Sequence, residues 1–374
     1  MSKSFDVCIR GDGVVGRTLA LLLAQARLRV ALVAKPGSAP ALQSAAADVR
    51  AYALNSASRQ VLESLRAWPD ASFATPVREM QVWGDDGGKL NFTAQSLAPS
   101  AQERALAWIV DVPALEHLLM EAGRYQPHID IVAEPAPATL NVICEGHRSS
   151  SRGEFGVQWT VKPYPQRAIA ARLESDQAHQ GVARQWFSGG DVLALLPLGG
   201  AEGNSLALVW SVSVERASSL QKLTPEAFCA ALQLDCQHQA GSLRLTSERA
   251  TWPLALSNAG HWVGPGWALA GDAAHTVHPL AGQGLNLGLA DAACLARVIA
   301  EREYWRPLGD EKLLRRYERA RKADVAAIGA VTDGLQGLFA QTGGPWQALR
   351  NWGMNRFSQS GPLKTWITRQ ASGL

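Results

Sequence analysis

Three glycines near the start of the chain have the spacing of a turn that binds phosphate. Gly11, Gly13 and Gly16 form a GxGxxG pattern between an expected strand at residues 5–9 and an expected helix at 17–26. In such a turn the first glycine allows a tight bend, the second lets the backbone approach a pyrophosphate, and the third lets helix and strand pack closely. The pattern predicts a nucleotide-binding turn; a tight strand-to-helix turn without a ligand is the alternative.

Two residues near this turn are unfavourable for nucleotide binding. Asp12 places a negative charge inside the turn, where it would repel a phosphate. An acidic residue is expected about 20 residues further on, to hold the ribose hydroxyls, but the chain has Ala34 and Lys35 there. Lys35 could offset part of this loss by reaching a phosphate. We therefore expect a dinucleotide to be held loosely and to be lost readily on purification.

A second glycine-rich stretch runs from Gly271 to Gly288 and follows an expected strand at 267–270. The carboxylate of Asp272, directly after that strand, can accept hydrogen bonds from the hydroxyls of a sugar alcohol. A glycine turn then opens an expected helix at about 284–301, and the first N–H groups of a helix favour negative charge. The alternative is a glycine-rich loop that serves packing alone.

These motifs give the chain a specific resemblance, which extends over most of its length. The residues that carry it are 271–288, the arginine-led stretch 50–65, the stretch 107–119, and the apolar runs 194–198 and 205–211. The chain resembles the FAD-binding aromatic hydroxylases related to para-hydroxybenzoate hydroxylase, and within them the flavin hydroxylases of ubiquinone biosynthesis. The resemblance implies that Asp272 binds the ribityl chain of FAD, residues 282–286 the isoalloxazine edge, and Arg50 the pyrophosphate side, with Pro279 beside the flavin ring. The expected cofactor-binding residues are Gly11, Gly13, Gly16, Arg50, Gly271, Asp272, Pro279, Gly282, Gln283, Gly284, Leu285 and Asn286.

The chain departs from the family pattern mainly on the adenosine side. Glu145 replaces the aspartate of an Asp-Gly motif, although Gly146, Ser149 and Arg152 stay in register. Pro113 stands where the family's middle helix supplies an arginine. The residues expected at the flavin ring are retained, so the resemblance implies an uneven FAD site.

The resemblance implies an NAD(P)H-dependent monooxygenase that hydroxylates an aromatic ring, with NAD(P)H as a transient reductant and O2 as co-substrate. The expected substrate is a polyprenylated phenol, held in an apolar cavity lined from residues 192–197 and 205–210. The pattern singles out no catalytic base. Two other functions remain open. One is a flavin-poor paralogue that acts as a partner or scaffold for ubiquinone-biosynthesis enzymes, and the other is a flavin dehydrogenase or reductase on the same fold.

The elements that would position these residues predict an α/β protein. We expect a Rossmann-like FAD-binding domain with an inserted antiparallel β-sheet substrate domain and a helical C-terminus. The expected FAD-binding domain is discontinuous and comprises residues 1–68, 105–148 and 250–330. The substrate domain comprises 69–104 and 149–249, and the C-terminal helical segment 331–374. Helices are expected at 53–68, 112–122, 225–234 and 313–328. Strands are expected at 29–34, 138–144, 166–173, 182–187, 192–197 and 205–214, and a hairpin at 79–92.

Composition narrows the functional classes further. The net charge of +3 over 374 residues, without a basic run that contains aromatics, argues against nucleic-acid binding. The five cysteines form no CxxC pair, so they suit buried thiols in a reducing cytoplasm, and His275 and His278 suit loop residues better than metal ligands. We expect a cytoplasmic protein, because no signal peptide or membrane-spanning stretch is evident. A peripheral position at the inner membrane is compatible with this expectation. The aromatic and basic tail suits contact with a membrane or a partner as well as packing onto the body.

Overall fold

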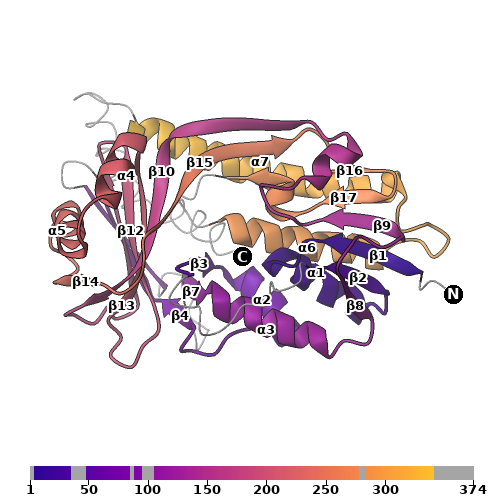
Figure 1. Cartoon of the computed structure of the whole chain (residues 1–374), viewed down its shortest axis with the longest axis horizontal. Coiled ribbons are helices and arrows are strands. Elements are labelled where there is room, and N and C mark those ends of the chain that lie inside the picture. The colour runs from indigo at the N-terminus through magenta and orange to yellow at the C-terminus, as the bar shows by residue number, and fades with distance from the viewer. Residues whose placement is uncertain (1–3, 35–47, 85–87, 95–104, 278–282, 341–374) are drawn as a thin grey trace.

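A computed structural model describes residues 4–34, 48–84, 88–94, 105–277 and 283–340, with side chains described up to residue 327. It confirms the expected α/β architecture, in which a sheet covered by helices is joined to a separate, mainly antiparallel sheet (Figure 1). In the part of the chain that is described, no helix is both long and apolar enough to cross a membrane.

A six-stranded sheet forms the centre of the first layer. Its strands are β1 (Phe5–Arg10), β2 (Val30–Val33), β8 (Ile129–Val132), β9 (Ala138–Ile143), β16 (Val263–Gly264) and β17 (Trp267–Leu269), in the order β16-β17-β9-β1-β2-β8. The strands pair in parallel except β16 with β17. Val7, Ile9 and Val30 are fully buried, as expected for parallel strands that are covered on both faces.

Four helices pack in this layer: α1 (Val14–Gln25), α3 (Val112–Arg124), α6 (Gly284–Ala300) and α7 (Glu311–Ala340). Helix α1 contacts both α3 and α6, and α6 contacts α7. The expected helices at 17–26, 112–122 and 284–301 are therefore confirmed within a few residues. Helix α7 is longer than the expected helix at 313–328. It continues without a break past residue 330, the expected end of the FAD-binding domain, to Ala340.

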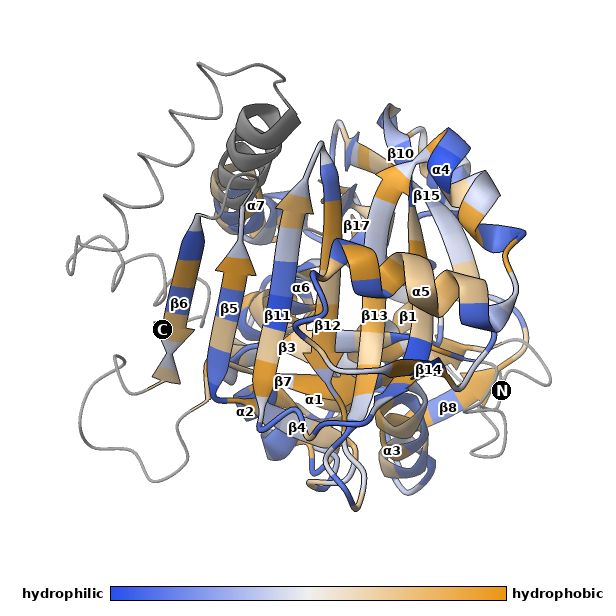
Figure 2. Ribbon diagram, turned by 90° about the vertical axis from the view of Figure 1, so that its left-hand side faces the viewer, coloured by the Kyte–Doolittle hydropathy of each residue, from blue (hydrophilic) through white to orange (hydrophobic). Residues whose placement is uncertain are grey.

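A nine-stranded sheet forms the second layer. It contains β5 (Glu79–Trp83), β6 (Lys89–Thr93), β10 (Trp159–Ser175), β11 (Val182–Ser188), β12 (Asp191–Pro197), β13 (Ser205–Ser213), β14 (Leu243–Leu245), β15 (Ala250–Ala259) and β18 (His275–Thr276). Helices α4 (Val214–Gln221) and α5 (Pro225–Asp235) lie over its outer face (Figures 1 and 2). The expected strands at 182–187, 192–197 and 205–214, the 79–92 hairpin and the helix at 225–234 are confirmed.

Strand β10 is longer than expected and joins the two layers. The expected strand covered 166–173, whereas β10 begins at Trp159 and pairs with β15, which the sequence did not predict. Pro163, Pro165 and Pro253 obscured both strands, because proline cannot donate to a sheet. The register between β10 and β15 shifts between Pro163 and Arg167, so the sheet accommodates these prolines at an irregularity.

A small three-stranded sheet lies between the two layers. Its strands are β3 (Ala51–Leu54), β4 (Ala74–Val77) and β7 (Ala107–Asp111), in the order β3-β7-β4. The expected helix at 53–68 is wrong at both ends, since Ala53 and Leu54 belong to β3 and helix α2 spans Ser56–Ser64. The Asn55 side chain accepts a hydrogen bond from the Ser58 N–H, and this N-cap sets the helix start.

Candidate functional site

The GxGxxG turn has the geometry that its glycines require. Gly11 has φ +115°, and a β-carbon there would lie 2.5 Å from the Cys144 carbonyl oxygen. At Gly16 a β-carbon would lie 1.9 Å from the Gly11 carbonyl oxygen, whereas at Gly13 it would meet nothing within 4 Å. Gly13 is also the N-cap of α1 and has no side chain to cap the first N–H groups. The turn therefore leaves open space beside helix N–H groups, which suits a phosphate.

The acidic residue in this turn is neutralised by an arginine that sequence reasoning did not single out. The Arg17 Nε donates to the Asp12 carbonyl oxygen at 2.5 Å, and a terminal nitrogen of the same guanidinium donates to the Asp12 carboxylate at 3.2 Å. The Arg17 side chain is only 7% exposed. The repulsion expected from Asp12 is thus opposed by a buried cation next to it.

The two glycine motifs, far apart in the sequence, meet at Val15. A β-carbon on Gly271 would lie 3.3 Å from a methyl group of Val15, and one on Gly288 would lie 2.7 Å from the same methyl group. Gly271 has φ +63°, in the left-handed region that favours glycine. The fold therefore places the start of α1, the turn at Gly271 and the first turns of α6 side by side.

A buried carboxylate beneath this junction was also missed from sequence. Asp291, on α6, is fully buried and accepts hydrogen bonds from the Gly271 N–H at 2.9 Å, from His275 Nε2 at 2.7 Å and from Arg321 Nε at 2.7 Å. Burial by itself raises the pKa of Asp291, but the charge and hydrogen bond of His275 and the Arg321 guanidinium outweigh it and leave the pKa below its ordinary value. Asp291 thus ties the Gly271 turn to α6 and α7.

Asp272 follows in a short 3-10 turn and remains exposed to solvent. The surrounding protein nevertheless desolvates it and raises the pKa of its carboxyl, an effect that His275 and His147 partly counter. The negative charge of Asp272 also contributes, after burial, to the raised pKa of Tyr52 on β3. The carboxylate is therefore accessible to a ligand and lies near the small sheet.

The predicted residues at the start of α6 differ in what their side chains do. The Asn286 side chain is buried, donates to the Ala53 carbonyl oxygen at 2.8 Å, and accepts from the Asn55 N–H and the Ser58 hydroxyl. It fastens α6 to the turn between β3 and α2. A β-carbon on Gly284 would meet nothing within 4 Å, and Gln283 and Leu285 are half-buried. Pro279 and Gly282 lie outside the described residues.

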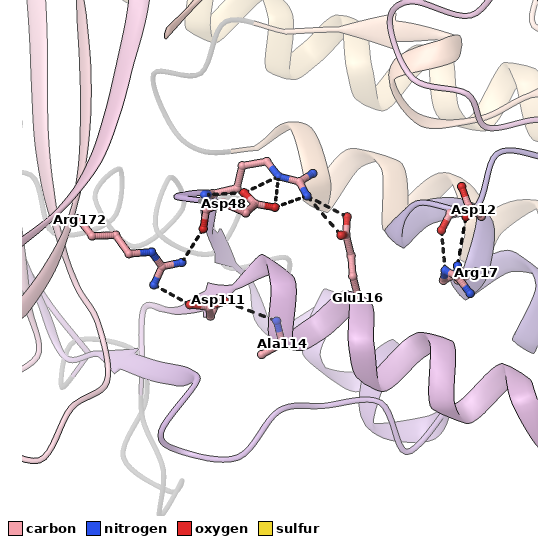
Figure 3. A network of polar contacts seen from close by, with 8 residues as sticks. Asp12, Arg17, Asp48, Asp111, Ala114, Glu116 and Arg172 are labelled. Atoms are coloured by element: carbon pink, nitrogen blue, oxygen red, sulfur yellow. Dashed lines mark hydrogen bonds and ion pairs between the residues drawn. The ribbon is translucent and has the colours of Figure 1, made fainter. Parts of the chain in front are cut away.

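Arg50 pairs with two carboxylates, those of Asp48 and of Glu116 on α3, both of which are labelled in Figure 3. Its guanidinium lies 2.6 Å from the Asp48 carboxylate and 3.2 Å from that of Glu116. The hydrogen bond with Asp48 raises the pKa of Arg50 most, burial opposes this, and the charge of Glu116 adds to it. Arg172 on β10 makes a further ion pair, 2.6 Å from Asp111 at the start of α3. Two carboxylates thus balance the charge of Arg50.

The Glu145 segment folds back on itself and supports the Gly271 turn. The Glu145 carboxylate accepts hydrogen bonds from the Ser149 and Ser151 hydroxyls at 2.6 and 2.7 Å. Arg152 donates to the Ala273 carbonyl oxygen at 3.2 Å, and its guanidinium lies 3.8 Å from the ring centre of Trp159. The Glu that replaces the family's Asp is therefore engaged within its own loop.

The inner face of the nine-stranded sheet presents only part of the two segments from which we expected a cavity to be lined. Alternate residues of 192–197 and 205–210 face opposite sides of the sheet. Leu193, Leu195, Leu206, Leu208 and Trp210 belong to the apolar core beneath α4 and α5. Ala207 instead packs with Ile109 of the small sheet. Only the alternate set, such as Val192, Ala194 and Val209, is left to face the first layer.

Two cavities of about 180 and 440 Å³ open at the junction of the small sheet and the turn between β12 and β13. Arg172 and Asp111 line the smaller one, and Thr75 and His179 the larger one. No predicted cofactor-binding residue lines either of the two. They therefore belong to the junction between the layers rather than to the glycine motifs.

A comparison with protein families finds a match to the FAD binding domain over residues 135–331. Among curated proteins, the chain is 30% identical to ubiquinone hydroxylase UbiL of Rhodospirillum rubrum, over 99% of this chain and 90% of that protein. It is 28% identical to 3-demethoxyubiquinol 3-hydroxylase of Escherichia coli, over 99% and 98%. The two protein alignments extend across both glycine motifs and the sheets, whereas the family match includes the second glycine stretch but not the GxGxxG turn.

Among solved structures, the fold is similar to that of PqsL from Pseudomonas aeruginosa in complex with 2-aminobenzoylacetate. The TM-score is 0.77 at 22% sequence identity, covering 96% of this chain and 99% of that chain. A similar match is p-nitrophenol 4-monooxygenase PnpA of Pseudomonas putida, with a TM-score of 0.75 at 17% identity. At these identities the likeness concerns the fold alone.

Proposed function

The chain belongs to the FAD-dependent monooxygenases of the FAD-binding-domain family, and on this premise we propose that it hydroxylates the ring of a prenylated phenol in ubiquinone biosynthesis. The observation that carries the proposal is the junction at Val15, where the GxGxxG turn meets Gly271 and Gly288. This junction brings together the two glycine motifs that, on this proposal, contact one extended dinucleotide. Relatives whose names specify ubiquinone hydroxylation match nearly the full chain.

The residues at this junction fit FAD. Gly13 offers open space beside the N-terminus of α1 for the pyrophosphate, and the exposed carboxylate of Asp272 can accept hydrogen bonds from the ribityl hydroxyls. The open backbone at Gly284, at the N-terminus of α6, suits the electron-rich edge of the flavin. When bound and reduced, FAD supplies the reaction with O2 that inserts an oxygen atom into an aromatic ring. The protein's own task is to hold the cofactor, orient the phenol and exclude water.

We place the phenol between the inner face of the nine-stranded sheet and the start of α6. The side chains left on that face include Val192, Ala194 and Val209, which are apolar and small. A face of this kind suits a lipophilic ring better than a charged one. Overall the reaction would consume O2 and two electrons from NAD(P)H, with one oxygen atom entering the ring and the other leaving as water.

A nicotinamide reductant and a membrane surface are two further participants in the proposed reaction. We propose that NAD(P)H reduces the flavin transiently, because the chain carries a single GxGxxG motif. A polyprenylated substrate would require the protein to work at the surface of the inner membrane, alone or with other ubiquinone-biosynthesis proteins.

The test uses the purified protein, FAD, a short-chain prenylated phenol and either NADH or NADPH in air. We expect the bands of oxidised flavin in the visible spectrum and a product heavier than the phenol by one oxygen atom in mass spectrometry. Consumption of the reduced nicotinamide without a hydroxylated product would support the reductase alternative. A protein that binds no flavin, even with added FAD, would support the scaffold alternative.

A further inference from the structure

The phosphate turn contains an acidic residue whose presence needs an explanation in an FAD site. Asp12 lies between Gly11 and Gly13, so its carboxylate belongs to the segment that the pyrophosphate would approach. The carboxylate is 22% exposed, and thus only partly screened by water. An unbalanced negative charge at this place would weaken the binding of a diphosphate.

Arg17 occupies the position that can balance this charge. It lies in the second turn of α1, and helical side chains lean toward the helix N-terminus, so its guanidinium returns to the turn. There it holds both the carbonyl oxygen and the carboxylate of Asp12, at 2.5 and 3.2 Å (Figure 3). Burial raises the pKa of Glu116 on α3, and the charge of Arg50 and, more weakly, that of Arg17 oppose this rise. Arg17 is therefore within electrostatic reach of both acidic groups.

The location of this cation is unusual for a helix. The N-terminal end of a helix carries partial positive charge and favours anions over cations. A side chain that is 7% exposed also loses most of its hydration. Asp12 compensates the charge of Arg17 here, and Arg17 in turn opposes the negative charge that Asp12 brings to the phosphate turn. The nearby cation Arg50 is already balanced by Asp48 and Glu116.

We propose that Arg17 is a positioning residue for FAD. It cancels the charge of Asp12 and holds the Asp12 carbonyl oxygen, so that the helix N–H groups beside Gly13 remain available to the pyrophosphate. This inference rests on the proposed function, since it assumes that FAD is the ligand. Asp12 and Arg17 then act as one charge-balanced unit in the phosphate turn.

The test is a double-mutant cycle. Each protein is first freed of flavin, and its affinity for FAD is then measured from the change in flavin fluorescence. The variants are Arg17→Met, Asp12→Asn and the two combined. We expect Arg17→Met to weaken FAD binding by about tenfold or more, because it removes the buried cation that opposes the Asp12 charge. Asp12→Asn should bind FAD as tightly as wild type or more tightly. The combined variant should return to within a few-fold of wild type.

The restoration in the combined variant separates this role from a merely structural one. If Arg17 only clamps the turn, the combined variant will bind FAD as weakly as Arg17→Met does, and the inference is wrong. Raising the salt concentration should also reduce the deficit of Arg17→Met, because salt screens the repulsion. If Arg17→Met does not fold, Arg17→Lys keeps the charge and should stay closer to wild type than Arg17→Gln. Wild-type protein that binds no FAD would overturn the proposed function itself.

Discussion

Gly13 and Gly16 are three residues apart, but a β-carbon would be blocked at one position and unhindered at the other. At Gly16 it would lie 1.9 Å from a backbone oxygen, whereas at Gly13 it would point into open space. Packing therefore explains the glycine at 16 but not the one at 13. Close approach of a ligand to the backbone is the remaining reason for Gly13.

This contrast predicts that two similar substitutions have different effects. Gly13→Ala should leave thermal stability unchanged or slightly higher, because φ is −73° there, yet it should weaken FAD binding. Gly16→Ala should destabilise the fold by about 1–3 kcal/mol or more through overpacking. Thermal unfolding and FAD titration of both variants check this. Equal FAD affinity in Gly13→Ala and wild type would contradict a phosphate beside Gly13.

Asp272 is the residue on which the flavin assignment depends most. Because its carboxylate is exposed and makes no side-chain hydrogen bond within the described part of the chain, Asp272→Ala should release flavin while thermal stability stays normal. Asp272→Asn keeps the shape of the side chain without its charge, so its flavin content should lie between those of wild type and Asp272→Ala. The flavin-to-protein ratio after purification with added FAD measures the effect. An unchanged ratio in Asp272→Ala would remove this residue from the site.

We expect Ala34 to limit the affinity of the site for FAD. Its N–H continues the pairing of β2 with β8 by donating to Val132, and its methyl group cannot accept hydrogen bonds from ribose hydroxyls. Each bond to a carboxylate contributes roughly 1.5–3 kcal/mol. Ala34→Glu should therefore tighten FAD binding by about tenfold to a hundredfold. Ala34→Gln is the neutral control, and equal affinity in all three proteins would contradict an adenosine ribose at this position.

Sequence reasoning at this scale identified residues through spacing but missed residues that act through distant contacts. The glycines could be predicted because a turn requires them at fixed positions. In the sequence, Arg17 resembles any polar helix residue. Its pairing with Asp12 becomes visible only in the folded structure. Asp291 and Arg321 are 30 positions apart, and nothing in the sequence links them.

At the scale of elements, the Asp291 network joins three segments. Asp291 on α6 binds the Gly271 N–H, and Arg321 on α7 binds Asp291. Tyr317, one turn earlier on α7, donates to the Leu269 carbonyl oxygen at 2.8 Å. Helices α6 and α7 thus both stabilise the turn that carries Asp272.

We predict that Asp291→Asn destabilises the protein by about 3 kcal/mol, the lower end for a broken buried pair, because Arg321 keeps its pair with Asp324. Arg297→Ala, at an exposed pair on the same helix, should cost about 0–1 kcal/mol. Urea unfolding of the three proteins compares them. Equal loss in both variants would show that the buried network has no special role.

The same pair makes stability depend on pH in a defined direction. The pKa of Asp291 in the folded protein lies below its ordinary value of 3.8. Its contribution is therefore fully present above that value and is lost as the pH falls through the lower folded pKa. The stability gap between wild type and Asp291→Asn should shrink in that acidic range and stay constant near neutrality. A gap that shrinks toward alkaline pH instead would contradict this direction.

The prediction of elements from sequence succeeded where the apolar pattern was local. The parallel strands β1 and β9 and the helices α3 and α5 appear where apolar runs or amphipathic spacing placed them. The errors have physical causes. Prolines hid β15 and the first half of β10, and the cap at Asn55 divided an expected helix into β3 and α2. Such caps and cross-strand partners depend on the tertiary fold.

At the scale of the whole molecule, the two layers meet through charged and apolar contacts. Arg172 of the nine-stranded sheet pairs with Asp111 at the start of α3. Ala207 and Ile109 pack in a shared apolar cluster. The nine-stranded sheet is therefore fixed relative to the small sheet and α3. In the function that we propose, this arrangement holds the phenol in one orientation toward the flavin.

The central claim is that this molecule transfers an oxygen atom from O2 to a prenylated phenol. The most direct measurement is turnover under isotopically heavy O2 in ordinary water, with FAD, reduced nicotinamide and the phenol, followed by mass spectrometry of the product. We predict that the new hydroxyl carries one heavy oxygen atom, and that Asp272→Ala forms far less of this product. A product whose new oxygen comes from water, or no hydroxylated product from a protein that binds FAD, would contradict the account.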